Sequence, residues 1–219
     1  MARLKGERRR TPSSRAWLQR QLRDPYVARA KREGFRSRAA YKLAEIDDKF
    51  HLLKSGLRVV DLGAAPGGWS EIAARRVGAS GRVVALDILD MKPLAGVAFL
   101  KLDFLEETAP DVLKKALGGA ADLVMSDMAA NATGHRQTDH LRIMALAAAA
   151  AHFAREVLGR GGSFLCKVLQ GGTEAALLSE LKREFASVKH IKPPASRSDS
   201  AELYLLARGF HVRWGRGLA

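Results

Sequence analysis

The feature that most restricts the fold of this chain is a glycine-rich turn after a short apolar run. Residues 57–63 (LRVVDLG) are rich in β-branched side chains, and residues 69–78 have the spacing of a helix that ends at glycine. Glycines at positions 63, 67 and 68 allow the backbone to turn sharply and to come close to a ligand. A strand, a glycine turn and a helix in this order predict a binding site at the carboxyl end of a parallel strand.

The rest of the chain continues the alternation of strands and helices. Helices are predicted from about residue 13 and over 36–50, 108–117, 138–159 and 172–185. Further strands are predicted at 82–87, 98–103, 121–127, 162–169, 187–193 and 202–209. This pattern predicts a Rossmann-like α/β fold, a seven-stranded and mostly parallel sheet with helices on both faces. The last two strands are joined by a short Pro/Ser loop without a helix, which predicts an antiparallel last strand.

The positive charge of the chain is concentrated near its amino terminus. Residues 1–42 contain 14 lysines and arginines against three acids, a net of +11, which leaves +3 of the total +14 for the other 177 residues. A charge concentrated in this way favours binding to a polyanion, although a solvated basic tail is the alternative. Residues 1–35 are therefore expected to form a basic arm and helix, disordered at its start, and residues 36–219 a single domain.

Several other classes of protein are disfavoured. The single cysteine, Cys166, excludes an intramolecular disulfide, and the six histidines show no metal-ligand spacing, so no metal site is expected. No apolar run is long enough to span a bilayer, and the basic start has no apolar segment after it. A cytoplasmic monomer without membrane contact is expected.

Acidic residues at the strand ends predict the kind of cofactor. Asp61 precedes the glycine turn, Asp87 ends the next strand and Asp103 follows the third, with Phe104 beside it. An acid before the turn repels a pyrophosphate and suits an ammonium group, Asp87 suits ribose hydroxyls, and Asp103 with Phe104 suits an adenine. Because the glycine spacing also differs from G-x-G-x-x-G, these residues favour S-adenosylmethionine over a dinucleotide.

Four charged residues are expected to converge at the same edge of the sheet. Lys167 lies inside an apolar strand, where a lysine is costly to bury unless it is paired. Asp127 ends the fourth predicted strand, Glu202 begins the last one, and Lys42 lies on the helix before the sheet. A lysine removes a proton only in its neutral form, which Lys42 and a bound sulfonium favour and the two carboxylates oppose. The hypothesis is that Lys167 is the base, that Asp127 orients it, and that Lys42 with Glu202 holds a ribose.

The chain closely resembles the FtsJ/RlmE type of ribosomal RNA 2′-O-ribose methyltransferase, from about residue 13 onward. The matching stretches are SRAAYKL (37–43), DLGAAPGGWS (61–70), VMSDMA (124–129), GGSFLCKV (161–168) and KPPASRSDSAELY (192–204). The resemblance implies a Lys-Asp-Lys-Glu catalytic tetrad at Lys42, Asp127, Lys167 and Glu202. With the residue-based reading, the expected cofactor positions are Asp61, Gly63, Pro66, Gly67, Gly68, Trp69, Asp87, Asp103, Phe104 and Asp127. Two positions depart from the family pattern: Ala130, where relatives usually have proline, and Leu169, where they commonly have phenylalanine.

By the same resemblance, the expected substrate is a uridine of 23S ribosomal RNA in the large ribosomal subunit. Candidate RNA contacts are Arg32, Arg36, Arg38, Lys42 and Arg197. Two alternatives stay open at this point: a non-catalytic RNA-binding assembly factor, and a 2′-O-methyltransferase that acts on transfer RNA.

Overall fold

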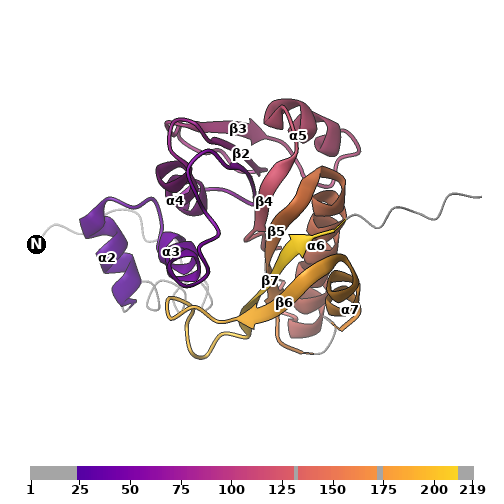
Figure 1. Cartoon of the computed structure of the whole chain (residues 1–219). Coiled ribbons are helices and arrows are strands. Elements are labelled where there is room, and N and C mark those ends of the chain that lie inside the picture. Colours follow the sequence, from indigo (N-terminus) through magenta and orange to yellow (C-terminus); the bar gives the residue numbers. More distant parts are fainter. Residues whose placement is uncertain (1–23, 131–132, 172–174, 212–219) are drawn as a thin grey trace, which may run out of the picture.

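A single seven-stranded sheet organises the chain (Figure 1). The computed structural model describes residues 24–130, 133–171 and 175–211. The strand order is β3-β2-β1-β4-β5-β7-β6. The five strands from β3 to β5 pair in parallel, whereas β7 is antiparallel to both β5 and β6. The predicted fold class and antiparallel last strand are therefore confirmed.

The elements follow one another in the predicted alternation. The strands are β1 (Arg58–Leu62), β2 (Arg82–Asp87), β3 (Val97–Lys101), β4 (Ala121–Ser126), β5 (Leu158–Leu169), β6 (Phe185–Ile191) and β7 (Glu202–Phe210). The helices are α2 (Pro25–Glu33), α3 (Ala39–Phe50), α4 (Gly68–Val77), α5 (Ala109–Leu117), α6 (Arg136–Val157) and α7 (Ala175–Glu184). None of the helices in the described ranges is long and apolar enough to cross a membrane.

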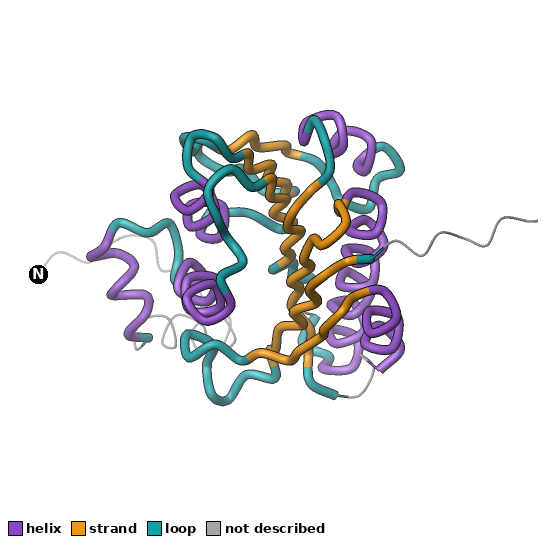
Figure 2. Tube along the Cα trace, viewed as in Figure 1, coloured by secondary structure: helices purple, strands orange, loops and turns teal. Residues whose placement is uncertain are grey.

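Helices cover both faces of the sheet, with one apolar core on each side (Figure 2). Helices α3 and α4 pack on one face, and α5, α6 and α7 pack on the other. Successive strand residues contribute to opposite cores, as the period of two requires: Leu165 lies in the α3/α4 core and Phe164 and Cys166 in the other. This alternation places Lys167 on the α3 side of the sheet, facing the helix that carries Lys42.

The order of the strands defines where a ligand can bind. The chain leaves β1 toward β2 and β3 on one side and later returns to β4 and β5 on the other. The carboxyl ends of β1 and β4 therefore lie side by side at a point where the direction of winding reverses. Open α/β sheets bind ligands in the crevice at such a point.

Helix α2 was not predicted as a separate element, although the sequence marks both of its ends. The Asp24 side chain accepts a hydrogen bond from the Tyr26 amide, Pro25 occupies the first turn, and Gly34 ends the helix at φ 74°. The helix expected from residue 13 lies outside the described residues. Strand β5 also begins earlier than predicted, at Leu158, which pairs with Ala121 before the register shifts.

Candidate active site

The glycine turn lies directly above the switch point of the sheet. Gly63 has φ 78° and its amide donates to the Leu86 carbonyl at 2.9 Å, which ties the turn to β2. A Cβ atom at this position would lie 2.6 Å from Met128 Cγ and 2.8 Å from Met128 Cα. Gly67 has φ 109° and precedes α4. Both glycines are thus required by backbone conformation, and Gly63 also by the close approach of the loop after β4.

Asp61 is fully buried beneath this turn. Ser70 Oγ donates to its Oδ2 at 2.6 Å, whereas the buried Oδ1 has no hydrogen-bond partner among the described residues. Burial is the main cause that raises the pKa of Asp61 to about 7; the Ser70 hydrogen bond lowers it, and Asp127 and Asp87 raise it. A buried acceptor without a donor is costly, so Oδ1 fits a ligand that brings a positively charged donor, such as the ammonium group of S-adenosylmethionine.

The other expected cofactor residues differ in their surroundings. Asp87 accepts backbone hydrogen bonds from Ala65 at 2.9 Å and from Leu89 at 2.8 Å, one on each carboxylate oxygen. Asp103 is exposed and accepts from the Leu105 amide at 2.9 Å. Each carboxylate oxygen has a second lone pair, so these contacts leave both acids able to accept from a ribose or an amine.

The two aromatic candidates lie mainly in the cores. Phe104 is 8% exposed and packs edge-on against Phe153, with centroids 5.9 Å apart. Trp69 is 2% exposed, donates from Nε1 to the Ala39 carbonyl at 2.9 Å and packs at 5.5 Å from the Tyr204 ring. Trp69 therefore joins α4 to α3 and supports the strand that carries Tyr204.

Lys167 and Asp127 form an ion pair at the carboxyl ends of β4 and β5. The Lys167 ammonium lies 3.1 Å from Asp127 Oδ1 and donates to the Asp127 carbonyl at 2.7 Å. Burial alone raises the pKa of Asp127, but the charges of Lys167 and Lys42 and a Tyr204 hydrogen bond bring its pKa below the ordinary value. Asp127 is therefore an ionised acceptor that fixes the position of the lysine.

Lys42 and Glu202 form a second pair next to the first. Lys42 Nζ lies 2.5 Å from Glu202 Oε1, and the side chains are 10% and 17% exposed. Glu202 Oε1 also accepts from Ser196 Oγ at 3.0 Å, which ties the pair to the loop between β6 and β7. The structure thus brings all four sequence-predicted residues into one cluster of two lysines and two carboxylates.

Tyr204 links the two pairs. Its hydroxyl lies 2.8 Å from Asp127 Oδ1 and 3.2 Å from Glu202 Oε1, and it accepts from Lys42 Nζ at 3.1 Å. Burial, followed by the two carboxylates, raises the pKa of Tyr204 well above its ordinary value, so the phenol keeps its single proton and shares it between them. Tyr204 was not among the predicted site residues, although it stands two residues after Glu202, on the same face of β7.

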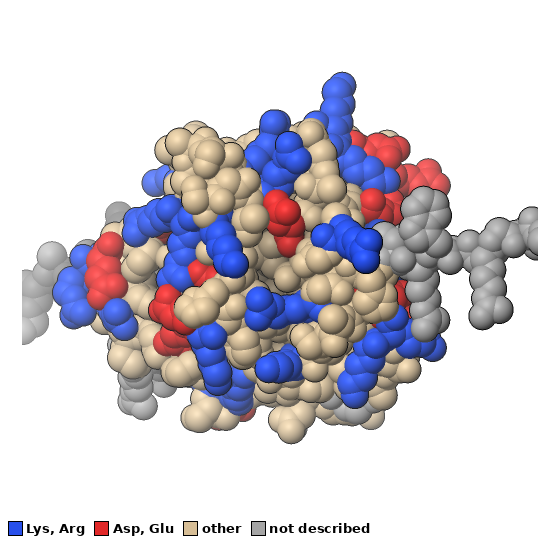
Figure 3. Space-filling view, in the orientation of Figure 1, with Lys and Arg blue, Asp and Glu red and all other residues tan. Residues whose placement is uncertain are grey.

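The arginines expected to contact RNA are placed around this cluster in different ways. Arg32 is 74% exposed, whereas Arg36 donates to the carbonyls of Lys92 at 2.6 Å and Pro93 at 2.5 Å. Arg38 and Arg197 both lie against Asp24. Lysine and arginine side chains are spread over the face in Figure 3, with smaller acidic groups among them.

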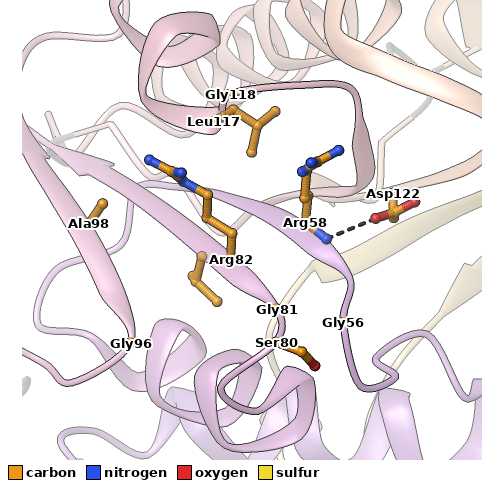
Figure 4. A pocket seen from close by; sticks show the side chains of 11 residues that line it. Gly56, Arg58, Ser80, Gly81, Arg82, Gly96, Ala98, Leu117, Gly118 and Asp122 are labelled. Atoms are coloured by element: carbon orange, nitrogen blue, oxygen red, sulfur yellow. Dashed lines mark hydrogen bonds between the residues drawn. The ribbon is translucent and has the colours of Figure 1, made fainter.

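A separate hollow lies at the opposite edge of the sheet, where β1 and β2 begin (Figure 4). Its volume is about 620 Å³, and Arg58 and Arg82 line it together with several glycines. Since this hollow is at the amino ends of the strands, it is distinct from the cluster above. No group of His, Cys, Asp and Glu in the described part of the chain is arranged to hold a metal ion.

Three features together define a protein of the S-adenosylmethionine-dependent methyltransferase class. They are a Rossmann-like sheet with an antiparallel seventh strand, a glycine turn, and acids at the ends of β1 and β2. The chain matches the FtsJ-like methyltransferase family over residues 35–210 and belongs to that family.

Named relatives and a solved structure agree with this assignment. The chain is 63% identical over 211 residues to ribosomal RNA large subunit methyltransferase E of Azorhizobium caulinodans, covering 95% of this chain and 88% of the relative. It is 64% identical to the protein of the same name from Xanthobacter autotrophicus, covering 95% and 83%. A crystal structure described as a ribosomal RNA methyltransferase from Plasmodium falciparum superposes with a TM-score of 0.73 at 27% identity, covering 82% of this chain and all of that one.

Proposed function

We propose that this chain transfers a methyl group from S-adenosylmethionine to a ribose 2′-hydroxyl of 23S ribosomal RNA, at a uridine of the large subunit. The observation that carries this proposal is the Lys167–Asp127 pair, buried at the switch point beside the unpaired Oδ1 of Asp61. The names of relatives that are more than 60% identical across most of the chain support the choice of RNA.

The residues present fit the methyl donor. S-adenosylmethionine supplies, when bound, an electrophilic methyl group on a positively charged sulfur. Asp61 would hold its ammonium group, Asp87 its ribose hydroxyls, and Asp103 its adenine amine, while Gly63 and Gly67 let the backbone approach it. Because Asp61, Asp87 and Asp127 lie close enough for the charges of the last two to raise the pKa of Asp61, the site favours a cationic ligand over a pyrophosphate.

Lys167 is the group that takes the proton. A ribose hydroxyl is a weak nucleophile, and its reaction requires both close alignment and removal of its proton. In this proposal the hydroxyl oxygen would take the methyl group as the donor's sulfur–methyl bond breaks, and the hydroxyl proton would pass to Lys167 Nζ, which accepts it as a neutral amine. Asp127 then stabilises the ammonium through the contacts at 3.1 and 2.7 Å, and it fixes the lysine before the reaction.

Lys42, Glu202 and Tyr204 position the ribose and the catalytic pair. The Lys42–Glu202 pair offers both a donor and an acceptor at the edge of the cluster, which suits the adjacent sugar hydroxyls. Tyr204 holds Asp127 in a fixed position relative to this pair, because its hydroxyl contacts both Lys42 and Asp127. The protein's preference for RNA over DNA would follow from these contacts, since DNA lacks the 2′-hydroxyl.

The proposal places the protein in the cytoplasm, as a monomer acting on the assembled large subunit. A non-catalytic assembly factor and a transfer RNA enzyme are the alternatives, and the Lys167→Ala variant separates the first from an enzyme. The enzyme should retain RNA binding and lose methyl transfer, whereas an assembly factor would keep its function. Lys189→Ala, which removes a lysine from edge strand β6, is the matched control. Transfer of label to unmodified transfer RNA but not to large subunits would select the other substrate.

A further inference from the structure

Two arginine side chains, those of Arg38 and Arg197, contact the carboxylate of Asp24 beside the candidate active site. Asp24 Oδ2 lies 3.2 Å from Arg38 Nη1, 3.0 Å from Arg197 Nε and 3.0 Å from Arg197 Nη2. The Asp24 side chain is only 5% exposed, and its other oxygen caps helix α2 through the Tyr26 amide at 3.0 Å. A single carboxylate oxygen thus serves two guanidinium groups that come from α3 and from the β6–β7 loop.

This arrangement leaves hydrogen-bond donors in excess. Arg38 Nε and Arg197 Nη2 are buried and have no hydrogen-bond partner in the described chain; the Arg197 Nη2 contact with Asp24 has the distance of an ion pair but not hydrogen-bond geometry. Buried N–H groups without acceptors are costly. A phosphate offers more acceptor oxygens than one carboxylate oxygen does, and arginine is well suited to bind it in a bidentate manner.

The arginine pair is close to the residues that would hold the ribose. Arg38 lies four residues before Lys42, and residues with that spacing on a helix have Cβ atoms about 5–6 Å apart. Arg197 follows Ser196, whose hydroxyl donates to Glu202 at 3.0 Å. A phosphate held by both arginines would therefore lie beside the residues proposed to hold the ribose, on the side where a backbone phosphate of the target nucleotide could bind.

We propose that Asp24 occupies the binding site of an RNA phosphate in the free protein, and that the phosphate flanking the target ribose displaces it. This inference rests on the proposed function, because it identifies how the same site receives its RNA. Helix α2 is also held by two hydrogen bonds to α3, from the Tyr26 hydroxyl to Glu45 at 2.9 Å and from the Tyr41 hydroxyl to Glu33 at 2.7 Å, and by the packing of Ala30 with Tyr41. These contacts do not involve the Asp24 carboxylate, so they can keep the helix in place when Asp24 is displaced. The arginine pair is thus shielded until a polyanion competes for it.

Removing the charge of Asp24 tests the displacement. Asp24→Asn keeps a side chain that caps helices as well as aspartate does, but it no longer carries the competing charge. If Asp24 leaves the two arginines free in about a tenth of the wild-type molecules, a variant in which they are always free should bind RNA about tenfold more tightly. The probe is a labelled 12-nucleotide single-stranded RNA, and its affinity is measured by fluorescence anisotropy at a series of salt concentrations.

Two further variants make the result specific. Asp48→Asn makes the same change of net charge on α3, ten residues and about 15 Å along the helix from Arg38, and should leave the affinity nearly unchanged. Arg197→Gln should weaken binding and reduce the salt slope by about 0.7 for one lost phosphate contact. The free Asp24→Asn protein should also melt at a lower temperature than the wild type, although it binds RNA more tightly.

The opposite sign of change would overturn the proposal. If Asp24→Asn weakens RNA binding, Asp24 positions the arginines instead of competing for them; if its affinity equals that of Asp48→Asn, no phosphate binds there. An unchanged affinity in Arg197→Gln would overturn it as well, even if Asp24→Asn failed to fold. Failure of the proposed function is detected by a different measurement. If the wild type transfers no methyl group to large subunits, the proposed function is wrong, whatever the oligonucleotide affinities are.

Discussion

Replacing Asp61 by asparagine should change the stability of the free protein in a direction that depends on pH. The carboxyl group is fully buried and its pKa is raised from 3.8 to about 7. Because the folded protein binds this proton more tightly than the unfolded chain does, protonation of Asp61 stabilises the fold. This stabilisation is complete below about pH 4 and is lost as the pH rises toward 7. The difference of about 3 units corresponds to about 4 kcal/mol at 1.36 kcal/mol per unit. Above pH 7 the buried Asp61 carboxylate lowers the free energy of unfolding of the wild type by this whole amount.

The asparagine variant does not carry the charge, but it introduces another cost. Its amide NH₂ would take the place of the unpaired Oδ1, and a buried donor without a partner costs about 1–3 kcal/mol. At pH 8 the variant should therefore exceed the wild type in free energy of unfolding by about 1–3 kcal/mol. At pH 4, where the native carboxyl is neutral and the unfolded one is only about half ionised, the variant should be the less stable protein by about 0.5–2.5 kcal/mol.

Urea unfolding of both proteins without cofactor, at pH 4 and pH 8, measures this change of sign. Asp111→Asn, an exposed acid of α5, controls for the change of net charge. Saturating S-adenosylmethionine should stabilise the wild type by about 2.7 kcal/mol at a hundred times its Kd and should stabilise Asp61→Asn much less. If the difference in free energy of unfolding between variant and wild type is the same at both pH values, burial of the Asp61 charge is not its cause.

Three further predictions concern the cluster and the core. Tyr204→Phe keeps the buried ring but removes the hydroxyl that contacts Lys42, Asp127 and Glu202. We expect kcat to fall by about ten- to a hundredfold with little change in melting temperature. An unchanged kcat would show that catalysis does not need this hydroxyl. A double-mutant cycle of Lys42→Met and Glu202→Gln in thermal unfolding should give a coupling of about 0.5–3 kcal/mol, and additive effects would mean that the 2.5 Å contact contributes nothing. Burial raises the pKa of Cys166 to about 12, so iodoacetamide at pH 8 should modify it only after unfolding; rapid labelling of the native protein would contradict its placement in the core.

The sequence was sufficient to predict the sheet and the location of the site because both follow local rules. The period-two pattern of residues 164–168 determined which side chains face α3, and the glycine turn marked the switch point. Asp127, Lys167 and Glu202 could be proposed because each stands at a strand end or inside an apolar run, where a charge requires a partner. Lys42 lies on helix α3, and its place in the tetrad was implied by the resemblance to the family.

Contacts between distant segments could not be predicted in the same way. Tyr204 contacts Lys42 and Asp127, which are 162 and 77 residues away along the chain, so its role depends on the order of the strands. The contacts of Asp24 with Arg197, 173 residues away, depend on how α2 packs against the β6–β7 loop. Phe104 and Trp69 were assigned to the cofactor by position, and only the structure shows how far both rings are buried.

Mapping the methylated atom shows whether Lys167 and Asp127 direct a methyl group to a ribose hydroxyl. Large ribosomal subunits that lack the modification are incubated with the protein and methyl-labelled S-adenosylmethionine, and the labelled nucleotide of 23S RNA is identified. Label is expected on a single ribose 2′-oxygen with the wild type and with Lys189→Ala, and none is expected with Lys167→Ala. Label on a base or on protein, or full labelling by Lys167→Ala, would show that Lys167 does not have this role.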